Sequence, residues 1–359
     1  MIAAGTFDGD HLSLVLQVWR AVDSAILGDV ADSSRVTTAP APFVTRRMTP
    51  NGPREPAIEI QDLRKQYGRV EALAGLTMTV ERGEVFGFLG PNGAGKTTTV
   101  KLLLGLARPT SGGGRLLGAP IGDLETRRRV GYLPELFRYQ PWLRAREVLD
   151  VHADLIGLPH TDRRRSIDDA LGLVGLAERA GDLVGGFSKG MQQRLGLAVA
   201  LIGRPELVFL DEPTSALDPL GRIDVRAIIR AVRDRGTAVF LNSHLLTEVE
   251  LVCDRVAIVA RGRVVSEGRL DDVLGAPEVT IRLTGLDSTT LSALEAFGAP
   301  ALDGDGLTLR GMDLERVPDL VEALVRAGCR IHAVDAGRRS LEQRFIDLVG
   351  GDASTGAAA

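Results

Sequence analysis

The segment GPNGAGKT at residues 90–97 has the composition and spacing of a loop that holds phosphate groups. It matches the pattern G-x-x-x-x-G-K-[ST] without a mismatch, follows the apolar run EVFGFLG and leads into the helix-like run TTTVKLLLGL. Glycines allow backbone N–H groups to turn inward around phosphate oxygens, and a helix N-terminus adds its dipole. We expect Lys96 to reach the β- and γ-phosphates and the Thr97 hydroxyl to bind Mg²⁺. The residues predicted to hold the nucleotide here are Gly90, Pro91, Asn92, Gly93, Ala94, Gly95, Lys96, Thr97 and Thr98.

Two further segments place polar residues directly after apolar strands. In ELVFLDEP, Asp211 is expected to hold Mg²⁺, and Glu212 to orient or deprotonate an attacking water molecule. In NSHLL, the imidazole of His244 is expected to reach the γ-phosphate. An acidic pair at a strand end is often only a helix cap, and a lone histidine is usually structural. The presence of the phosphate loop in the same chain favours the catalytic interpretation of both.

The segment FSKGM at residues 187–191 predicts a second phosphate-binding element. Ser188 offers a hydroxyl and Gly190 an unobstructed backbone N–H, and a helix expected to start near Met191 would direct its positive end to the same place. The first loop already surrounds a nucleotide from one side. We therefore expect the second element to close over the γ-phosphate bound by another subunit, in a head-to-tail pair with two-fold symmetry.

The composition is that of a globular chain with more than one domain. The 359 residues are 44% hydrophobic and carry a formal net charge of −4, which gives no electrostatic support to nucleic-acid binding. The two cysteines, Cys253 and Cys329, have neither metal-ligand spacing nor the pattern of a disulfide framework. No apolar run approaches the roughly 18 residues that a membrane-spanning helix needs.

Strand-like and helix-like segments alternate from residue 57 onward, which predicts an α/β domain over residues 57–274 with a mostly parallel sheet covered on both faces. A helical insertion is expected at about 107–195, and a small α+β domain at 275–350. Residues 1–56 contain a Pro- and Thr-rich linker and are expected to be disordered or a non-native extension. Residues 351–359 are expected to be a disordered tail.

The chain resembles the ATP-binding subunits of ABC transporters, with about residues 57–270 covered and five elements in the right order. FSKGM stands at the family's LSGGQ signature, so the resemblance implies contacts from Ser188, Lys189, Gly190 and Met191 to ATP. SALD matches the D-loop and includes Asp218, and Tyr67 lies where the family stacks an aromatic ring on adenine. Two departures stand out: Lys189 replaces a glycine of the signature, and Glu135 in GYLPE replaces the glutamine that binds Mg²⁺ or water.

GYLPE, SKGM and a C-terminal SLEQRFIDL together resemble the ABC-2-type exporter ATPases. The resemblance implies a homodimer, or a pair with another ATPase subunit, joined through two ATP molecules with Mg²⁺. It also implies integral membrane permease partners, a peripheral position on the cytoplasmic face of the cell membrane, and no nucleic-acid partner. An importer ATPase and a soluble ABC-type ATPase remain alternatives. Phe137, Tyr139 and Trp142 lie where the family receives its membrane subunits, and they could either form that interface or pack inside the insertion.

Overall fold

The computed structural model describes residues 55–215, 217–303 and 306–355. The expectation that residues 1–56 are disordered or non-native falls almost wholly outside this range. The same holds for the last four residues of the chain.

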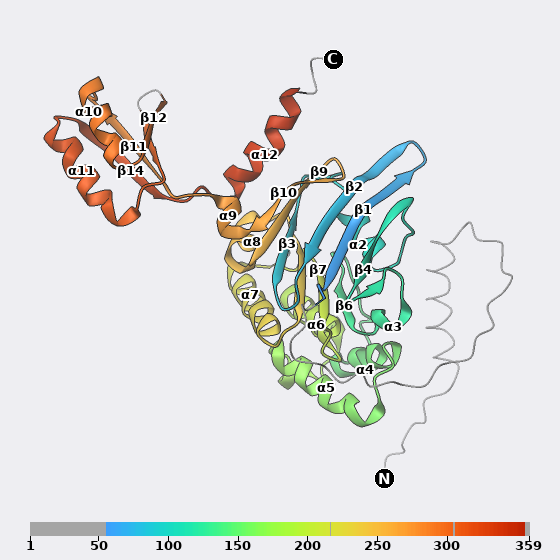
Figure 1. Cartoon of the computed structure of the whole chain (residues 1–359). Coiled ribbons are helices and arrows are strands. Elements are labelled where there is room, and N and C mark those ends of the chain that lie inside the picture. Colours follow the sequence, from blue (N-terminus) through green and yellow to red (C-terminus); the bar gives the residue numbers. More distant parts are fainter. Residues whose placement is uncertain (1–54, 216, 304–305, 356–359) are drawn as a thin grey trace, which may run out of the picture. The chain divides into compact units, whose positions relative to one another are not determined.

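A six-stranded sheet forms the centre of the first domain (Figure 1), in the order β10-β9-β3-β8-β7-β6. The strands from β9 to β6 are parallel, and β10 pairs with β9 in the antiparallel sense. Every residue of β3, β7 and β8 is buried, which matches their continuous apolar sequences and a sheet covered on both faces. The bounds are β3 Val85–Leu89, β6 Val130–Leu133, β7 Leu207–Asp211, β8 Ala238–Asn242, β9 Arg255–Ala260 and β10 Arg263–Arg269.

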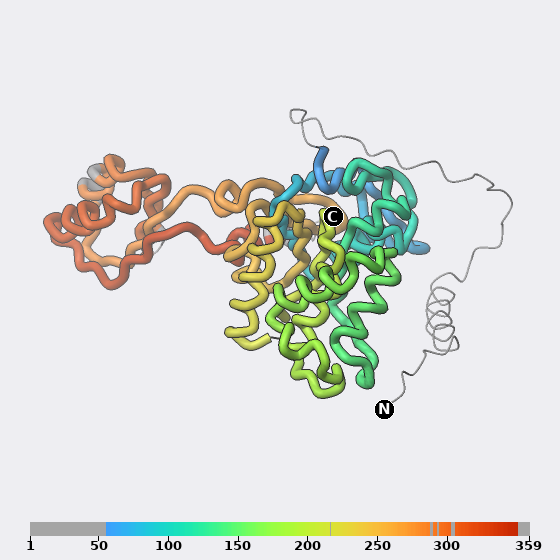
Figure 2. Tube along the Cα trace, turned by 90° about the horizontal axis from the view of Figure 1, so that it is seen from below, coloured from blue at the N-terminus to red at the C-terminus, as the bar shows by residue number. Residues whose placement is uncertain are grey.

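Different elements cover the two faces of this sheet. One face packs against helices, and in Figure 2 the chain from α4 to α6, green to yellow-green, shows these helices side by side. The other face packs against α2 and a four-stranded antiparallel sheet in the order β2-β1-β4-β5. The helices of the first face are α4 Ala145–Leu155, α5 His160–Leu173, α6 Lys189–Leu201, α7 Pro219–Asp234 and α8 Leu246–Val252. The elements of the second are α2 Lys96–Leu103, β1 Ile58–Tyr67, β2 Val70–Val80, β4 Ser111–Leu116 and β5 Ala119–Pro120. These layers confirm the predicted α/β fold.

The expected helical insertion at about 107–195 is too wide at its start. Its first part contains β4, β5, the short helix α3 (Leu124–Arg127) and β6, and the longer helices begin only at Ala145. The sequence of β4, SGGGRL, has no apolar alternation that would indicate a strand. Its glycines instead let the β4 backbone approach β1 closely. A Cβ atom added at Gly112 would lie 1.9 Å from the carbonyl oxygen of Asp62. Short 3₁₀ turns at Ala177–Arg179 and Val184–Gly186 lead into α6.

The C-terminal segment forms the expected α+β unit, with a four-stranded antiparallel sheet in the order β12-β13-β11-β14. Alternate residues of β11 are buried with Leu320 and Leu324 of α11, so the sheet has its own apolar core. The βαββαβ order and sheet arrangement correspond to the split βαβ motif. The bounds are β11 Glu278–Thr284, α10 Ser288–Ala293, β12 Ala299–Asp303, β13 Gly306–Arg310, α11 Val317–Arg326 and β14 Arg330–Gly337, with 3₁₀ turns at Leu294–Ala296 and Leu314–Arg316.

The last helix, α12 (Leu341–Thr355), belongs to the core of the first domain and not to this second unit. Leu341 is fully buried, and its backbone N–H donates to the Glu250 carboxylate on α8 at 3.0 Å. The Arg344 guanidinium donates to the carbonyl of Val273, at the end of α9 (Leu270–Leu274), at 2.8 Å. The boundary expected at residue 350 therefore falls inside a helix, and the βαββαβ unit is an insertion between α9 and α12. Apolar periodicity identified the helix but could not show which core it joins.

Candidate active site

The phosphate loop connects the end of β3 to the start of α2, and glycine is required at its last turn. Gly95 is the N-cap of α2 with φ of 101°, a left-handed conformation that side chains disfavour. A Cβ atom at Gly95 would also lie 2.5 Å from Leu73 Cδ2 and 2.6 Å from the Ala72 carbonyl oxygen. The backbone is therefore held in a fixed curve, with Thr97 exposed at the surface.

Lys96 folds back over this loop. Its ammonium group donates to the carbonyl oxygens of Gly90 at 2.6 Å and Pro91 at 3.2 Å. Burial lowers the pKa of Lys96, while the nearby carboxylates of Glu212 and Asp211 act in the opposite direction. An anion bound at the phosphate loop would therefore offset the cost of burying the positive charge of Lys96.

Asp211 ends strand β7 and is buried. Asn242 Nδ2, at the end of the neighbouring strand β8, donates to Asp211 Oδ1 at 2.5 Å. Burial raises the pKa of Asp211, and the charges of Glu135 and Glu212 raise it further, while the Asn242 hydrogen bond and Lys96 lower it. An ionised carboxylate in this place is electrostatically costly until a cation approaches.

Glu212 is held in a single orientation by the loop that follows β8. Its backbone has φ of 52°, in the left-handed region that few non-glycine residues occupy outside functional sites. Its Oε1 accepts the backbone N–H of His244 at 2.9 Å, and its Oε2 accepts the Ser243 hydroxyl at 3.4 Å. The Glu212 N–H donates to the Asn242 carbonyl at 2.8 Å. The carboxylate is therefore positioned before any substrate binds.

His244 contacts Glu212 directly, which the sequence did not indicate. Its Nδ1 lies 2.8 Å from Glu212 Oε1, and 61% of its side chain is exposed. With Nδ1 engaged, Nε2 is the ring nitrogen left for another partner, and the expected contact of His244 with the γ-phosphate stays a prediction. Asn242, Ser243 and their contacts to the acidic pair were missed. A polar residue at the end of each of two adjacent buried strands was the signal that could have revealed them.

The second phosphate element has a different character. Helix α6 begins at Lys189 and not near Met191, with Ser188 as its N-cap and the Ser188 Oγ accepting the Met191 N–H at 3.3 Å. Ser188 and Lys189 are exposed, and a Cβ atom at Gly190 would meet only Leu217 Cδ2, at 3.8 Å. Gln193 Nε2 donates to the Pro213 carbonyl at 2.9 Å, which ties α6 to the loop after Glu212.

The other predicted site residues lie near the surface. Asp218 is the N-cap of α7, and its Oδ1 accepts the Gly221 N–H at 2.9 Å. Tyr67, at the end of β1, is 48% exposed, and the Lys65 ammonium lies 4.6 Å from the centroid of its ring. Glu135 follows β6, is exposed, and is close enough for its charge to raise the pKa of Asp211.

The donor atoms suit Mg²⁺, which prefers oxygen ligands and binds proteins through one or two carboxylates plus substrate phosphates. Asp211, Glu135 and Thr97 supply carboxylate and hydroxyl oxygens. Within residues 55–215, 217–303 and 306–355, His, Cys, Asp and Glu form no cluster of three or more that could hold a metal ion unaided. A site of this kind would depend on the phosphates for its remaining ligands.

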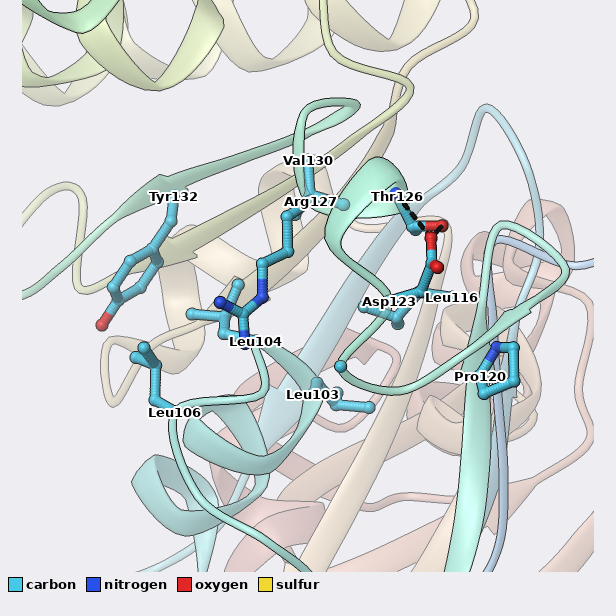
Figure 3. Close-up of a pocket in the computed structure, with 11 residues that line it drawn as sticks. Leu103, Leu104, Leu106, Leu116, Pro120, Asp123, Thr126, Arg127, Val130 and Tyr132 are labelled. Atoms are coloured by element: carbon cyan, nitrogen blue, oxygen red, sulfur yellow. Dashed lines mark hydrogen bonds between the residues drawn. The ribbon is translucent and has the colours of Figure 1, made fainter. Parts of the chain in front are cut away.

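A separate apolar pocket of about 200 Å³ lies between the end of α2, β5, α3 and β6 (Figure 3). Its polar groups are already engaged: Asp123 accepts the Thr126 N–H and hydroxyl, and Arg127 donates to the Gly105 carbonyl. Burial raises the pKa of Tyr132, which also lines the pocket, to about 12. The lining is mostly apolar, and its charged side chains, Asp123 and Arg127, are engaged in these contacts. None of the described helices is both long enough and apolar enough to cross a membrane.

Comparison of the chain with known proteins shows the family to which it belongs. The family model described as ABC transporter matches residues 73–215. An uncharacterised ABC transporter ATP-binding protein of Synechocystis sp. is 44% identical over 281 residues, which are 77% of this chain and 78% of that protein. The bacitracin transport ATP-binding protein BcrA of Bacillus licheniformis is 35% identical, covering 82% of this chain and 97% of the relative. The daunorubicin resistance ATP-binding protein DrrA3 of Streptomyces coeruleorubidus is also 35% identical, covering 82% and 96%.

A solved structure described as the ATP-binding subunit of an ABC transporter superposes with a TM-score of 0.56 and 32% identity, covering 60% of this chain and 91% of that one. The similarity to DrrA3, BcrA and the Synechocystis protein extends over most of each relative. The chain therefore belongs to the ABC transporter ATP-binding proteins, whose ATP-binding domain hydrolyses ATP to power transport.

Proposed function

We propose that this chain is the ATP-hydrolysing subunit of an ABC-2-type exporter. The observation that carries the proposal is the length of the similarity to relatives named for bacitracin transport and daunorubicin resistance. Those alignments span 301 and 306 residues, more than residues 57–274 can supply, so they include the βαββαβ insertion or α12 as well as the ATPase domain. No contact or motif in the described residues favours the importer or the soluble alternative.

Nucleotide binding in this proposal uses the pre-shaped loop. The ammonium of Lys96 exchanges its two loop carbonyls for β- and γ-phosphate oxygens, which are stronger acceptors because they are charged. The residues from Gly90 to Thr98 surround the phosphates, and the exposed Tyr67 ring stacks on the adenine. Asp211, Thr97 and Glu135 would hold Mg²⁺, which neutralises charge on the β- and γ-phosphate oxygens.

Hydrolysis is assigned to Glu212. Its carboxylate accepts a proton from the water that attacks the γ-phosphorus in line with the leaving oxygen. Glu212 is already fixed by three hydrogen bonds. The His244 N–H and the Ser243 hydroxyl donate to its carboxylate, and its own backbone N–H donates to the Asn242 carbonyl. His244 serves two purposes, since Nδ1 orients Glu212 and Nε2 can contact the transferred phosphate. Such pre-organisation removes the need to reorient the base during the reaction.

The second element completes the site from another copy of the chain. Ser188 Oγ, the Gly190 N–H and the exposed Lys189 and Met191 would cover the γ-phosphate bound by the partner, with Asp218 near the same interface. The chain would thus form a homodimer, or pair with another ATPase subunit, around two ATP molecules. Because ATP contacts both subunits only in the closed dimer, its binding favours closure, and hydrolysis removes that preference.

The contact with a membrane subunit is assigned to the segment after Glu135. Phe137 and Tyr139 pack on each other, with ring centroids 5.4 Å apart, and against the core of the first domain. Leu136 and Trp142, by contrast, are 87% and 68% exposed. Of the two interpretations open for these aromatics, packing describes Phe137 and Tyr139, and an interface is proposed for Trp142 with Leu136. This contact would hold the chain at the cytoplasmic face of the membrane, with no role for nucleic acid.

Copurification tests this function most directly. Full-length tagged chain is expressed in its own host, membranes are solubilised in mild detergent, and associated proteins are identified and quantified. A stoichiometric polytopic membrane protein of ABC-2 type is expected. A Leu136→Ser, Trp142→Ser double variant should lose it, while Leu155→Ser, at a leucine on α4 that is 55% exposed, should retain it. A permease of importer type, or ribosomal or chromosomal proteins alone, would contradict the proposal.

A further inference from the structure

Asn242 lies at the edge of the main sheet from which the phosphate loop and the acidic pair extend, on the strand between them. It is the last residue of β8, and its Cα is paired with Phe88 on β3 and with Asp211 on β7. The first of these strands leads into the phosphate loop, and the second ends in the acidic pair. Asn242 is only 4% exposed, so any polar group on its side chain needs a partner inside the protein or in a bound ligand.

The orientation of its amide follows from chemistry. Asn242 Nδ2 donates to Asp211 Oδ1 at 2.5 Å, and the ionised carboxylate that would hold Mg²⁺ can only accept hydrogen bonds. The NH₂ group must therefore face Asp211, and the carbonyl oxygen must face away from it. Asn242 Oδ1 is buried and has no hydrogen-bond partner among the residues that the structure describes.

An unpartnered buried acceptor leaves the cost of removing that atom from water uncompensated. The backbone carbonyl of the same residue is satisfied by the Glu212 N–H, so the deficit belongs to the side chain alone. Mg²⁺ gives up its hydration water reluctantly and usually reaches a protein with several waters still bound, each a hydrogen-bond donor. A buried acceptor next to Asp211 is therefore chemically matched to a donor that enters with the magnesium nucleotide.

We infer that Asn242 is a positioning residue with two functions: its amide orients Asp211, and its Oδ1 accepts a hydrogen bond from a water molecule that enters with the magnesium nucleotide. This inference rests on the proposed role of Asp211 in holding Mg²⁺. Partners of metal ligands that lie one shell further out commonly change metal affinity by about 10–100-fold when removed. Asn242 should consequently affect the Mg²⁺-dependent part of ATP binding and leave the rest unchanged.

The test measures the dissociation constant of ATP for the full chain, once with Mg²⁺ and once with a chelator, in a Glu212→Gln background that prevents turnover. Asn242→Leu should reduce the gain in affinity that Mg²⁺ provides by about 10–100-fold, with metal-free ATP bound as before. Asn242→Ser also lacks the amide carbonyl and should show the same direction of loss, which keeps the test valid if the leucine variant fails to fold.

The matched control is Thr237→Val, just before the other end of β8, which also removes one buried hydrogen bond, from Thr237 Oγ1 to the Pro205 carbonyl at 2.8 Å. It should retain the full Mg²⁺ gain. A folded Asn242 variant with the full gain would overturn the inference. So would an equal loss with and without Mg²⁺, because the donor would then be a protein group such as Lys96. If the parent chain shows no Mg²⁺ gain, or Asp211→Asn keeps it, the proposed role of Asp211 fails instead.

Discussion

The two elements proposed to bind phosphate differ in how far their own chain already positions them. The first has a glycine turn that admits no side chain, a lysine bonded to the loop, and an acidic pair fixed by the residues after β8. The second has an exposed serine whose hydroxyl only caps its own helix, and an exposed lysine. Around Gly190 the nearest atom that a Cβ would meet is 3.8 Å away.

This difference indicates where the site is complete and where it is open. Groups that must be rigid before the reaction are buried and cross-linked by hydrogen bonds within one chain. The groups that we propose to meet the nucleotide only after closure lie on the surface, as contacts that form and break in every cycle would require. The comparison predicts that variants of the first element lose nucleotide binding, metal-dependent affinity or the chemical step itself, while variants of the second keep ATP binding by the monomer and fail only when two chains meet.

Glu212→Gln should have the largest effect. The substitution keeps the shape of the side chain but removes the proton acceptor, a change typically worth about 10²–10⁴ in rate. ATP binding and ATP-dependent dimerisation should persist. Steady-state phosphate release measures turnover, and light scattering after gel filtration measures dimerisation. Glu206→Gln, at a surface ion pair with Arg82 and Arg129, is the control and should keep normal turnover. Near-normal turnover of the Glu212 variant would refute its catalytic role.

Gly190→Ala should separate the two elements most clearly. The added methyl group fits in the monomer, and alanine in place of glycine favours a helix by about 1 kcal/mol. We expect equal or higher thermal stability and unchanged ATP binding, with turnover reduced about 10–100-fold, because the added methyl group would hold the partner's phosphate away from the backbone N–H of residue 190 at the closed interface and weaken that hydrogen bond. Gly172→Ala in α5 places its added Cβ where no atom lies within 4 Å, and it should gain stability without losing activity. Normal turnover of the Gly190 variant would remove the second element from the site.

Ser188→Arg should likewise bind ATP as a monomer and fail to close.

Asp211→Asn should sharpen the description of the first element through stability. Burial raises the pKa of Asp211 above its ordinary value of 3.8, so folding disfavours the ionised form. In the nucleotide-free protein, the contribution of Asp211 is therefore present below pH 3.8 and is lost as pH rises through the raised pKa. The asparagine variant should be the more stable one at neutral pH, with a melting temperature about 2–4 °C higher for each kcal/mol recovered. Melting curves of both proteins across pH measure this difference, and a variant that is less stable at neutral pH would contradict it.

Lys189→Gly should have the smallest effect. Lys189 is exposed, and a cation in the first turn of a helix is unfavourable by about 0.3–1 kcal/mol, although it also attracts phosphate. We expect a change of less than about fivefold in the ATP concentration needed for dimerisation, and a change that shrinks as salt increases. An effect as large as that of Gly190→Ala would mean that the lysine makes a specific contact.

Much of the first element could be predicted because it depends on local patterns. The order of apolar strand, glycine loop and helix located Lys96, and the apolar runs before Asp211 and His244 placed both residues at one sheet edge. The contacts of His244 with Glu212 and of Asn242 with Asp211 were not predicted, because the polar residues at the two strand ends indicate such contacts only if β7 and β8 are known to be neighbours. Asp211 and Glu212 at the end of β7 meet the three residues 242–244 at the end of β8 only because the two strands pair in parallel.

The C-terminal part shows the same limit at a larger scale. The runs VTIRLTG, LTLRG and CRIHAVD predict the strands β11, β13 and β14, and SALEAFG and PDLVEALVRAG predict helices, whereas APALD, which forms β12, contains a proline and little alternation. The run SLEQRFIDLVG likewise predicts the helix that starts at Leu341, without showing that this residue is buried under α8. Periodicity reports that a face is apolar, whereas the partner of that face is decided by long-range packing.

Complementation between two inactive variants tests the central claim, a site shared by two chains, most directly. Lys96→Ala lacks a working first element, and Ser188→Arg lacks a working second one, so each should be inactive alone. In a 1:1 mixture, half of the randomly formed pairs are mixed, and each of these has one intact composite site, so about a quarter of the wild-type sites should be restored. Recovered ATP hydrolysis on mixing is the predicted result. A mixture as inactive as its components, although mixed dimers form, would show that each site is built within one chain.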